Sequence, residues 1–418
     1  MRRFALFNLL HPASFFMAFY LVFLVLGPFF LVFFPLYHSL EFSGRTLLLI
    51  LLYGGCFLAA ATAAPVMLGI PPVKAARVKL LVQPGWLPVG IVLWGLGVLA
   101  MLVFYTKAGG VPALAEDVET ARVTMKLGLG RYVLAGGGFL TMGLIYLHLM
   151  LADGQCHSFL FRLLVWMCTL VAAVLLMGIG FRAPAAFMLV TVLLARIVFS
   201  EGYQRRNRLQ WRWVLLGTAL FIVLALVGYY RNTGRFSMDA GIIIWPAIVH
   251  ASNLQNIIME FDNIAYFLGA SFVNDLMAAI PGVQGEFLGD YLKQLFALDF
   301  RGGGMTVTAP GEGYVNFGIP GMILHALVLG LLAGACYEFL AGRKDVQSRI
   351  LLLLVSLNLA RTVTSGIMPV LFFAFLPTLF AWWIGKVFLW VLSAEWQEYD
   401  GRPVGGSVPS GTGAQAAR

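Results

Sequence analysis

Charged residues are scarce in this 418-residue chain, and their scarcity excludes a soluble globular protein. Only 11% of the residues are Asp, Glu, Lys or Arg, whereas a soluble domain carries about a quarter. Hydrophobic residues make up 60% of the chain, and the mean hydropathy is +0.87. They form repeated apolar runs of about 20 residues, the length that a helix needs to cross a bilayer core of ~30 Å. The composition therefore predicts an all-α polytopic membrane protein.

Cysteine and histidine patterns are also missing, and this excludes several kinds of site. The four cysteines form no CxxC pair, and the six histidines show no HExxH or other ligand spacing. We therefore expect neither a disulfide framework nor a metal site. The glycine triplet at 302–304 is not followed by the Gly-Lys-Ser/Thr of a nucleotide-binding P-loop. No cofactor is predicted.

The apolar runs predict about ten transmembrane helices, and the basic residues between them set the orientation. The helices are expected at 13–36, 46–69, 86–105, 132–152, 160–180, 184–200, 213–230, 319–340, 350–366 and 368–393. Basic clusters at 2–3, 74–79, 205–212 and 343–349 fall on one side of this arrangement. The positive-inside rule places that side, and both termini, in the cytoplasm. This orientation explains most of the net charge of +9 without a nucleic-acid partner. The first apolar run is too long for a signal peptide, and we interpret it as an anchor.

We predict a transmembrane domain over 1–394 and a disordered, Gly/Ser-rich cytoplasmic tail over 395–418. Two loops on the opposite, periplasmic side, 107–131 and 231–317, are too long to be turns. The second contains two amphipathic pieces. One is expected to start at Ser252 or Asn253 as N-cap and to continue past Phe267, and the other is "GEFLGDYLKQLFAL" at 285–298. They form either a cap on the membrane domain or a lid whose interfacial helices contact acyl chains.

Arginines recur on this predicted periplasmic face. The set is Arg122, Arg182, Arg231, Arg235, Arg301 and Arg361. Arg361 lies inside an apolar run and Arg182 directly beside one, positions where a cation usually faces a cavity or a partner. Arg122 lies in a sequence that favours a solvated helix. Because arginine stays charged and binds phosphate oxygens in pairs, the set is a candidate anion site, with snorkelling to the interface as the alternative.

The most polar segment of the long loop is "RGGGMTVTAPGEGYVNFGIPG" at 301–321, directly before a predicted membrane helix. Its Glu312, Tyr314 and Asn316 would share one face of an extended chain but not of a helix. A carboxylate near arginines can accept the proton of an attacking hydroxyl while the arginines offset charge on a departing diphosphate. The alternative is a re-entrant loop whose polar groups satisfy one another.

Within this segment, "TVTAPGEGYVNFGIPGMI" resembles the stretch before a late transmembrane helix in Wzy-type O-antigen and exopolysaccharide repeat-unit polymerases, which carries a G-E-x-Y-x-N-F-G pattern. "AGGVPALAEDVETARVTMKLGLG" at 108–130 is similar to the first long outer loop of that family. The family also carries an arginine after a mid-chain helix and one within a late helix, and Arg182 and Arg361 match these positions more loosely. With the hydrophobic profile and the large late loop, the resemblance covers most of the chain.

The resemblance implies a metal-independent glycosyltransferase of GT-C-like architecture in the bacterial inner membrane. Its donor and acceptor would be undecaprenyl-diphosphate-linked oligosaccharides, and a chain-length regulator protein is a candidate partner. Diphosphate binding would fall to Arg182, Arg231 and Arg361, with Arg235 and Arg301 as second choices. The acceptor hydroxyl would be positioned or activated by Glu312, Tyr314 and Asn316, with His250, Asp262 and Glu286 as further candidate bases.

Two other functions stay open at this point. An O-antigen ligase would carry a histidine-containing site in its large outer loop, where His250 stands without a recognisable motif around it. A flippase or transporter of the same lipid-linked sugars would show internal repeats and charges at the membrane midplane on several helices. The sequence shows no convincing repeat, and its polar residues gather on one side.

Overall fold

The computed structural model describes residues 10–33, 42–70, 85–118, 120–121, 128–152, 158–200, 215, 222, 226, 240–280, 283–298, 303–343 and 345–399. Every regular element in these ranges is helical. Nine of the helical segments are long and apolar enough to cross a membrane. The chain is an all-α polytopic membrane protein, as its composition predicts.

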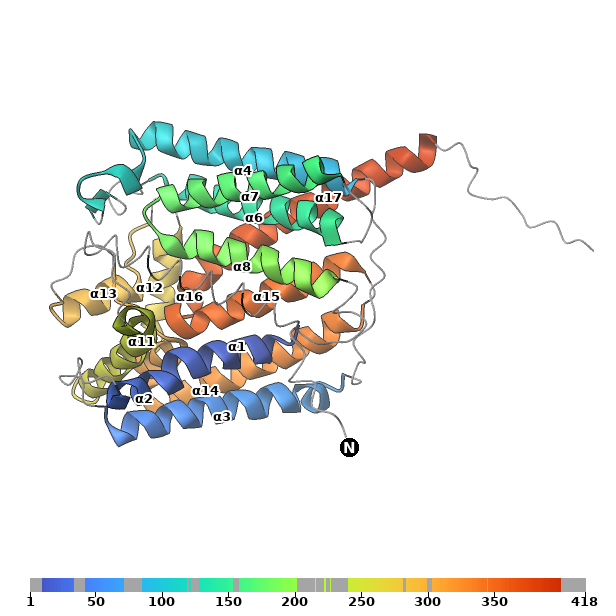
Figure 1. Cartoon of the computed structure of the whole chain (residues 1–418). Helices are drawn as coiled ribbons and strands as arrows, with labels where there is room; N and C mark the ends of the chain where they lie inside the picture. The colour runs from blue at the N-terminus through green and yellow to red at the C-terminus, as the bar shows by residue number, and fades with distance from the viewer. Residues whose placement is uncertain are drawn as a thin grey trace, which may run out of the picture.

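Successive membrane-crossing segments run in opposite directions, except that α8 and α14, which are separated by residues outside the described ranges, run in the same direction (Figure 1). The first combines α1 (Pro12–Tyr20), a π-helical turn η2 (Leu21–Val25) and α2 (Leu26–Phe33), and the last combines α16 (Ile367–Val370), η5 (Leu371–Phe375) and α17 (Leu376–Tyr399). Between them come α3 (Gly44–Met67), α4 (Trp86–Ala108), α6 (Gly130–Ala152), α7 (Phe159–Gly178), α8 (Arg182–Phe199), α14 (Ala309–Ala341) and α15 (Val346–Ser365).

These segments correspond to nine of the ten predicted spans. The remaining one, at 213–230, lies almost entirely outside the described residues. α14 begins at Ala309, but its backbone breaks at Phe317 and Gly318, so the stretch after the break begins where the span was predicted, at 319. The polar segment before the break is itself helical, with Thr308 as N-cap and a proline in the first turn. The last helix continues past the predicted start of the tail to Tyr399.

Small residues allow the longest helices to approach closely. On α14, Gly330 and Gly334 face α3, and an added Cβ would lie 2.3 Å from Phe57 O and 2.4 Å from Ala61 O respectively. Glycines spaced by four let two membrane helices bring their backbones into van der Waals contact. A similar approach joins α6 to α4, where a Cβ on Gly143 would lie 2.5 Å from Trp94 N. These contacts fix α14, which carries the polar segment, against the N-terminal helices.

Two short helices, α12 (Ala270–Ala279) and α13 (Leu288–Leu295), gather at one end of the molecule together with the longer α11 (Ala240–Phe261). We call this end, which also holds the first residues of α3, α8 and α14, the short-helix end (Figure 1). The prediction of a helix within 285–298 is confirmed by α13. The N-cap prediction at Ser252 or Asn253 is wrong, because both residues lie inside α11.

Candidate functional site

The first turns of α14 carry Glu312, Tyr314 and Asn316, and they end in a backbone break. Thr308 caps the helix, its Oγ1 accepting from Gly311 N at 3.2 Å. The helical geometry is interrupted at Phe317 and Gly318, and Gly318 has φ of 64°. A side chain there would also meet Tyr266, because a Cβ would lie 2.9 Å from its ring. Glycine is therefore required at position 318 by both the backbone conformation and the space.

The loop after α11 caps this break. Phe267 N donates to Val315 O at 3.0 Å, and Leu268 N donates to Asn316 O at 2.9 Å. These bonds satisfy carbonyl groups that a broken helix would otherwise leave without partners inside the protein. They also explain why α11 ends at Phe261: the residues that follow turn away to cap α14, with positive φ at Leu268 and Gly269.

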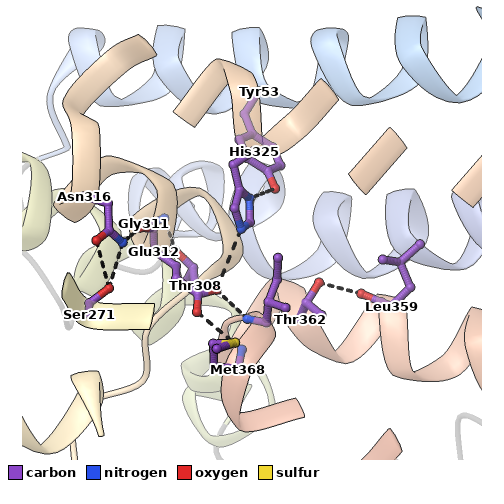
Figure 2. A network of polar contacts seen from close by, with 11 residues as sticks. Tyr53, Ser271, Thr308, Gly311, Glu312, Asn316, His325, Leu359, Thr362 and Met368 are labelled. Atoms are coloured by element: carbon purple, nitrogen blue, oxygen red, sulfur yellow. Dashed lines mark hydrogen bonds and ion pairs between the residues drawn. The ribbon is translucent and has the colours of Figure 1, made fainter. Parts of the chain in front are cut away.

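Asn316 ties the same break to α12. Its Oδ1 accepts from Gly269 N and from Ser271 Oγ, both at 3.0 Å. Its Nδ2 contacts Ser271 Oγ at 2.7 Å and donates to Glu312 O at 2.8 Å (Figure 2). Asn316 and Ser271 are both buried. The Asn316 amide therefore makes all of these hydrogen bonds inside the protein. Together they hold α12 against α14.

Glu312 is buried, with a relative exposure of 1%, and its carboxylate meets the start of the last membrane segment. Oε2 accepts from Ile367 N at 2.5 Å, and Oε1 accepts from Met368 N at 3.3 Å. A carboxylate at the first N–H groups of a helix is stabilised by their hydrogen bonds and by the helix dipole. Gly366, directly before these residues, has φ of 77° and leaves room for the carboxylate.

A second, partly buried side chain approaches Glu312 from within α14. His325 Nε2 lies 3.8 Å from Glu312 Oε2, and His325 Nδ1 is 2.9 Å from Tyr53 OH on α3 (Figure 2). Nε2 has no hydrogen-bond partner in the described part of the chain. A polar line therefore runs from α3 through α14 to the start of α16. The sequence interpretation missed His325, although a histidine inside an apolar run is the signal that would have indicated it.

Tyr314 contacts an ion pair between Arg45 and Asp262. Its hydroxyl donates to Asp262 Oδ1 at 2.7 Å. Arg45 on α3 forms an ion pair with Asp262 and donates to Tyr314 OH at 3.2 Å. The hydrogen bond from Arg45 holds the pKa of Asp262 below its ordinary value, with Tyr314 acting in the same direction. Arg45 was not among the arginines selected from the sequence, because it opens an early helix far from the polar segment.

Glu312, Tyr314 and Asn316 thus leave α14 in three directions. The helix separates side chains that an extended chain would have placed on one face. Each holds a different neighbour: α16, the Arg45–Asp262 pair and α12. His250, from α11, lies beside the preceding loop, where Thr306 Oγ1 is 3.2 Å from its Nδ1. Burial lowers the pKa of His250 to about 4, so its imidazole is neutral at pH 7.

Two of the predicted arginines are described, and helix α8 connects them. Arg182 is the first residue of α8 and is half-buried. Arg361, near the end of α15, lies over the ring of Phe187 on α8, with its guanidinium carbon 4.0 Å from the ring centroid. The Nε of Arg361 is buried and has no hydrogen-bond partner in the described structure. Arg122, Arg231, Arg235 and Arg301 lie outside the described residues.

No cluster of three or more His, Cys, Asp or Glu side chains that could hold a metal ion occurs among the described residues. The cysteines described there, Cys56, Cys168 and Cys336, are free thiols. The candidate site therefore consists of arginines, one buried carboxylate network and a capped helix break at the short-helix end.

Comparison with protein families gives one informative match. The family described as O-antigen polymerase matches residues 12–376, a range that includes all the candidate site residues and every membrane-crossing segment up to η5. No curated protein and no solved structure matches the chain.

Proposed function

The chain belongs to the O-antigen polymerase family, and we propose that it lengthens a glycan by transferring it from undecaprenyl diphosphate to a lipid-linked oligosaccharide repeat unit. In this proposal the protein is a GT-C-like enzyme of the bacterial inner membrane. The short-helix end faces the periplasm, and both termini are cytoplasmic. Basic residues between the spans support that orientation under the positive-inside rule.

The proposal rests on the surroundings of the Arg361 side chain, which in the described part of the chain lack an anion and a hydrogen-bond acceptor for its buried Nε. Its side chain lies between α15 and α8, its Nε is buried without a hydrogen bond, and it makes no ion pair with any residue that the structure describes. A guanidinium inside a membrane domain is costly unless an anion or a set of acceptors accompanies it. The ring of Phe187 supplies only a weak cation–π contact. A diphosphate would supply the missing charge and acceptors.

The position of Arg361 along its helix supports the same site. It lies five residues before Gly366, which directly precedes the last span, or about 7.5 Å along a helix at 1.5 Å per residue. Arg182 starts α8 at the same end of the molecule. Arg182, the last turn of α15 and the Glu312-capped start of α16 lie toward the same end of the molecule (Figure 1), and we place the lipid diphosphate there.

The transfer itself needs one bond made and one broken. A hydroxyl of the acceptor repeat unit attacks the anomeric carbon of the donor, and the bond from that carbon to the diphosphate oxygen breaks. The hydroxyl proton passes to a base, and the diphosphate leaves with the electron pair. Arg361 and Arg182 would stabilise the leaving group. Both Glu312 oxygens already accept backbone hydrogen bonds, so we assign Glu312 to hold α16 in place. His250, Tyr314 and Asn316 stay as predicted site residues.

The test is synthesis by purified protein in detergent or nanodiscs. Given the lipid-diphosphate-linked repeat unit, the wild type is expected to form a ladder of longer lipid-linked glycans without added metal. Arg361→Gln should lower kcat/KM by about 10²–10³, the usual loss when one donor to a developing charge is removed. A chelator that stops the ladder would refute metal independence, and a ladder that never forms would refute the proposed reaction.

Arg343→Gln is the matched control. Arg343 also lies over a phenylalanine ring, that of Phe339 at 4.4 Å, but it is exposed and lies beyond the end of α14 away from the candidate site. We expect this variant to keep the wild-type rate. Equal rates for the Arg361 and Arg343 variants would show that Arg361 does not bind the substrate.

A further inference from the structure

A cavity of about 500 Å³ lies beside α13, apart from the Glu312 network. Its lining consists of Gly285, Glu286, Phe287, Asp290, Lys293, Gln294, Ala297 and Leu298. Pockets that hold small molecules in proteins usually have volumes of about 300–1,000 Å³. The cavity therefore has room for a ligand of a few sugar rings, and it lies at the short-helix end, where α13 is labelled in Figure 1.

The lining offers hydrogen-bond acceptors and donors together. Glu286 and Asp290 supply carboxylate oxygens, and Lys293 and Gln294 supply N–H groups. Gln294 Nε2 donates to Glu286, so these two side chains already form a paired polar wall. Sugar hydroxyls both donate and accept, and they match such a mixed lining.

The charge of the lining argues against an anionic ligand. Two carboxylates and one ammonium leave the cavity negative when all three are ionised, and a diphosphate would be repelled. Burial raises the pKa of Asp290, although a hydrogen bond from Gly304 N opposes that shift. The arginine site around Arg361 has the opposite character. The structure thus separates a place suited to diphosphate from a place suited to uncharged, hydroxyl-rich groups.

The cavity helix is held from several sides, so its shape is preformed. Leu288 N, at the start of α13, donates to Asp275 Oδ1 of α12 at 2.6 Å. Met305 N donates to Gly289 O at 2.8 Å, and a Cβ on Gly304 would lie 2.3 Å from Gly289 C. Glycine at position 304 therefore lets the loop lie directly against α13. A preformed pocket binds without the cost of ordering its walls.

The same contacts connect the cavity to the candidate site. The loop that lies against α13 continues through Thr308 into the first turn of α14, which carries Glu312. Phe287, in the cavity lining, packs edge-on against Phe373 of the last membrane segment, with ring centroids 4.9 Å apart. A chain bound at α13 would therefore lie next to the elements that Glu312 joins.

We propose that the α13 cavity is a glycan subsite, which binds uncharged sugar residues of the lipid-linked oligosaccharide away from its diphosphate. This inference rests on the proposed polymerase function and adds to it a second recognition element. Glu286 and Gln294 contact the sugar hydroxyls, and Phe287 and Leu298 provide the apolar wall. The subsite selects the repeat unit by its sugars, and the arginines hold the diphosphate.

Binding of the free oligosaccharide tests the subsite. The probe is the repeat-unit oligosaccharide released from its lipid by mild acid, titrated calorimetrically into the full-length protein. The wild type is expected to bind it, and the double variant Glu286→Gln/Gln294→Ala should bind about tenfold more weakly, because one charge-assisted hydrogen bond is weakened and one neutral hydrogen bond is lost. Neither substitution removes a backbone contact of α13, and an unchanged melting temperature would verify that the variant is folded.

Two controls make the outcome decisive. Glu260→Gln changes an exposed carboxylate on the neighbouring α11 and should leave binding unchanged, and Arg361→Gln should also bind the free oligosaccharide normally because the probe has no diphosphate. Equal affinity of the wild type and the double variant, or no binding by the wild type, would overturn the subsite. Failure of the proposed function would be seen separately, as the absence of a glycan ladder from the lipid-linked substrate.

Discussion

Replacing Glu312 distinguishes a carboxylate that holds the structure from one that only takes a proton in the reaction. In the structure, the carboxylate is buried and accepts hydrogen bonds from Ile367 N and Met368 N. Glu312→Ala leaves both N–H groups without this partner at the start of the last membrane segment. An unsatisfied buried donor costs about 1–3 kcal/mol, so with two donors the alanine variant should lose roughly 2–6 kcal/mol of stability.

Glu312→Gln is the more discriminating change. The amide keeps the size of the side chain, but one of its ends is a donor that would face a backbone N–H. Its neutral oxygen also forms a weaker bond than a carboxylate does. We expect the variant to lose about 1–3 kcal/mol of stability, because one of the two charge-assisted hydrogen bonds to Glu312 is weakened and the other is lost. A residue that served only as a general base would lose activity on this change without losing stability.

The assay is tryptophan fluorescence during thermal unfolding of detergent-purified protein, since the chain has ten tryptophans. Both Glu312 variants should melt several degrees below the wild type, with alanine lower than glutamine. Glu260→Ala, at an exposed position on α11, is the control and should melt with the wild type. An unchanged melting temperature for Glu312→Gln together with complete loss of glycan synthesis would refute the structural role and support a role as base.

Two further predictions concern groups outside that network. Burial raises the pKa of Asp275 to about 7 from about 4 in the unfolded chain. Between pH 4 and pH 7 the unfolded chain loses this proton while the buried carboxyl keeps it, so protein stability should fall across that range by on the order of 4 kcal/mol, from three pKa units at about 1.4 kcal/mol each. Asp275→Asn should flatten that part of the melting-temperature profile, and an unaltered profile would contradict the argument. Gly334→Leu should separate α14 from α3 and cost more than ~3 kcal/mol by overpacking. A Cβ added at Gly55, which lies on α3, would meet nothing within 4 Å, so Gly55→Leu should be tolerated in the same unfolding assay. Equal melting temperatures for the Gly334→Leu and Gly55→Leu variants would disprove the close helix contact.

The spans and the polar segment were predictable because their signals are local. A run of about 20 apolar residues needs a membrane or a large core wherever the rest of the chain lies, and nine predicted spans correspond to helices in the structure. The segment 301–321 differed from its surroundings in composition alone. The helical piece within 285–298 was likewise readable from its apolar spacing, and α13 confirms it.

The conformation of 309–316 was not predictable in the same way. The sequence analysis considered an extended chain or a re-entrant loop there, yet Thr308 caps a helix and the loop at 267–269 satisfies its last carbonyl groups. Tertiary contacts thus outweigh the local preference of the sequence. The N-cap expected at Ser252 or Asn253 was wrong for a related reason: α11 packs against η2, α2 and α14, and this packing carries the helix through both residues.

The sequence by itself determined that this is a membrane protein of many helices, with a concentration of polar residues at one end of a late span. Hydrophobic length and composition need no partner, and they are therefore readable from the chain alone. Only the tertiary structure decided what each polar side chain contacts. Tyr314 meets Arg45 from 269 positions away, and His325 meets Tyr53 from 272 positions away. Such pairs depend on which helices lie side by side, and helix packing follows from the shape of whole surfaces, including the glycines of α14, rather than from any short motif.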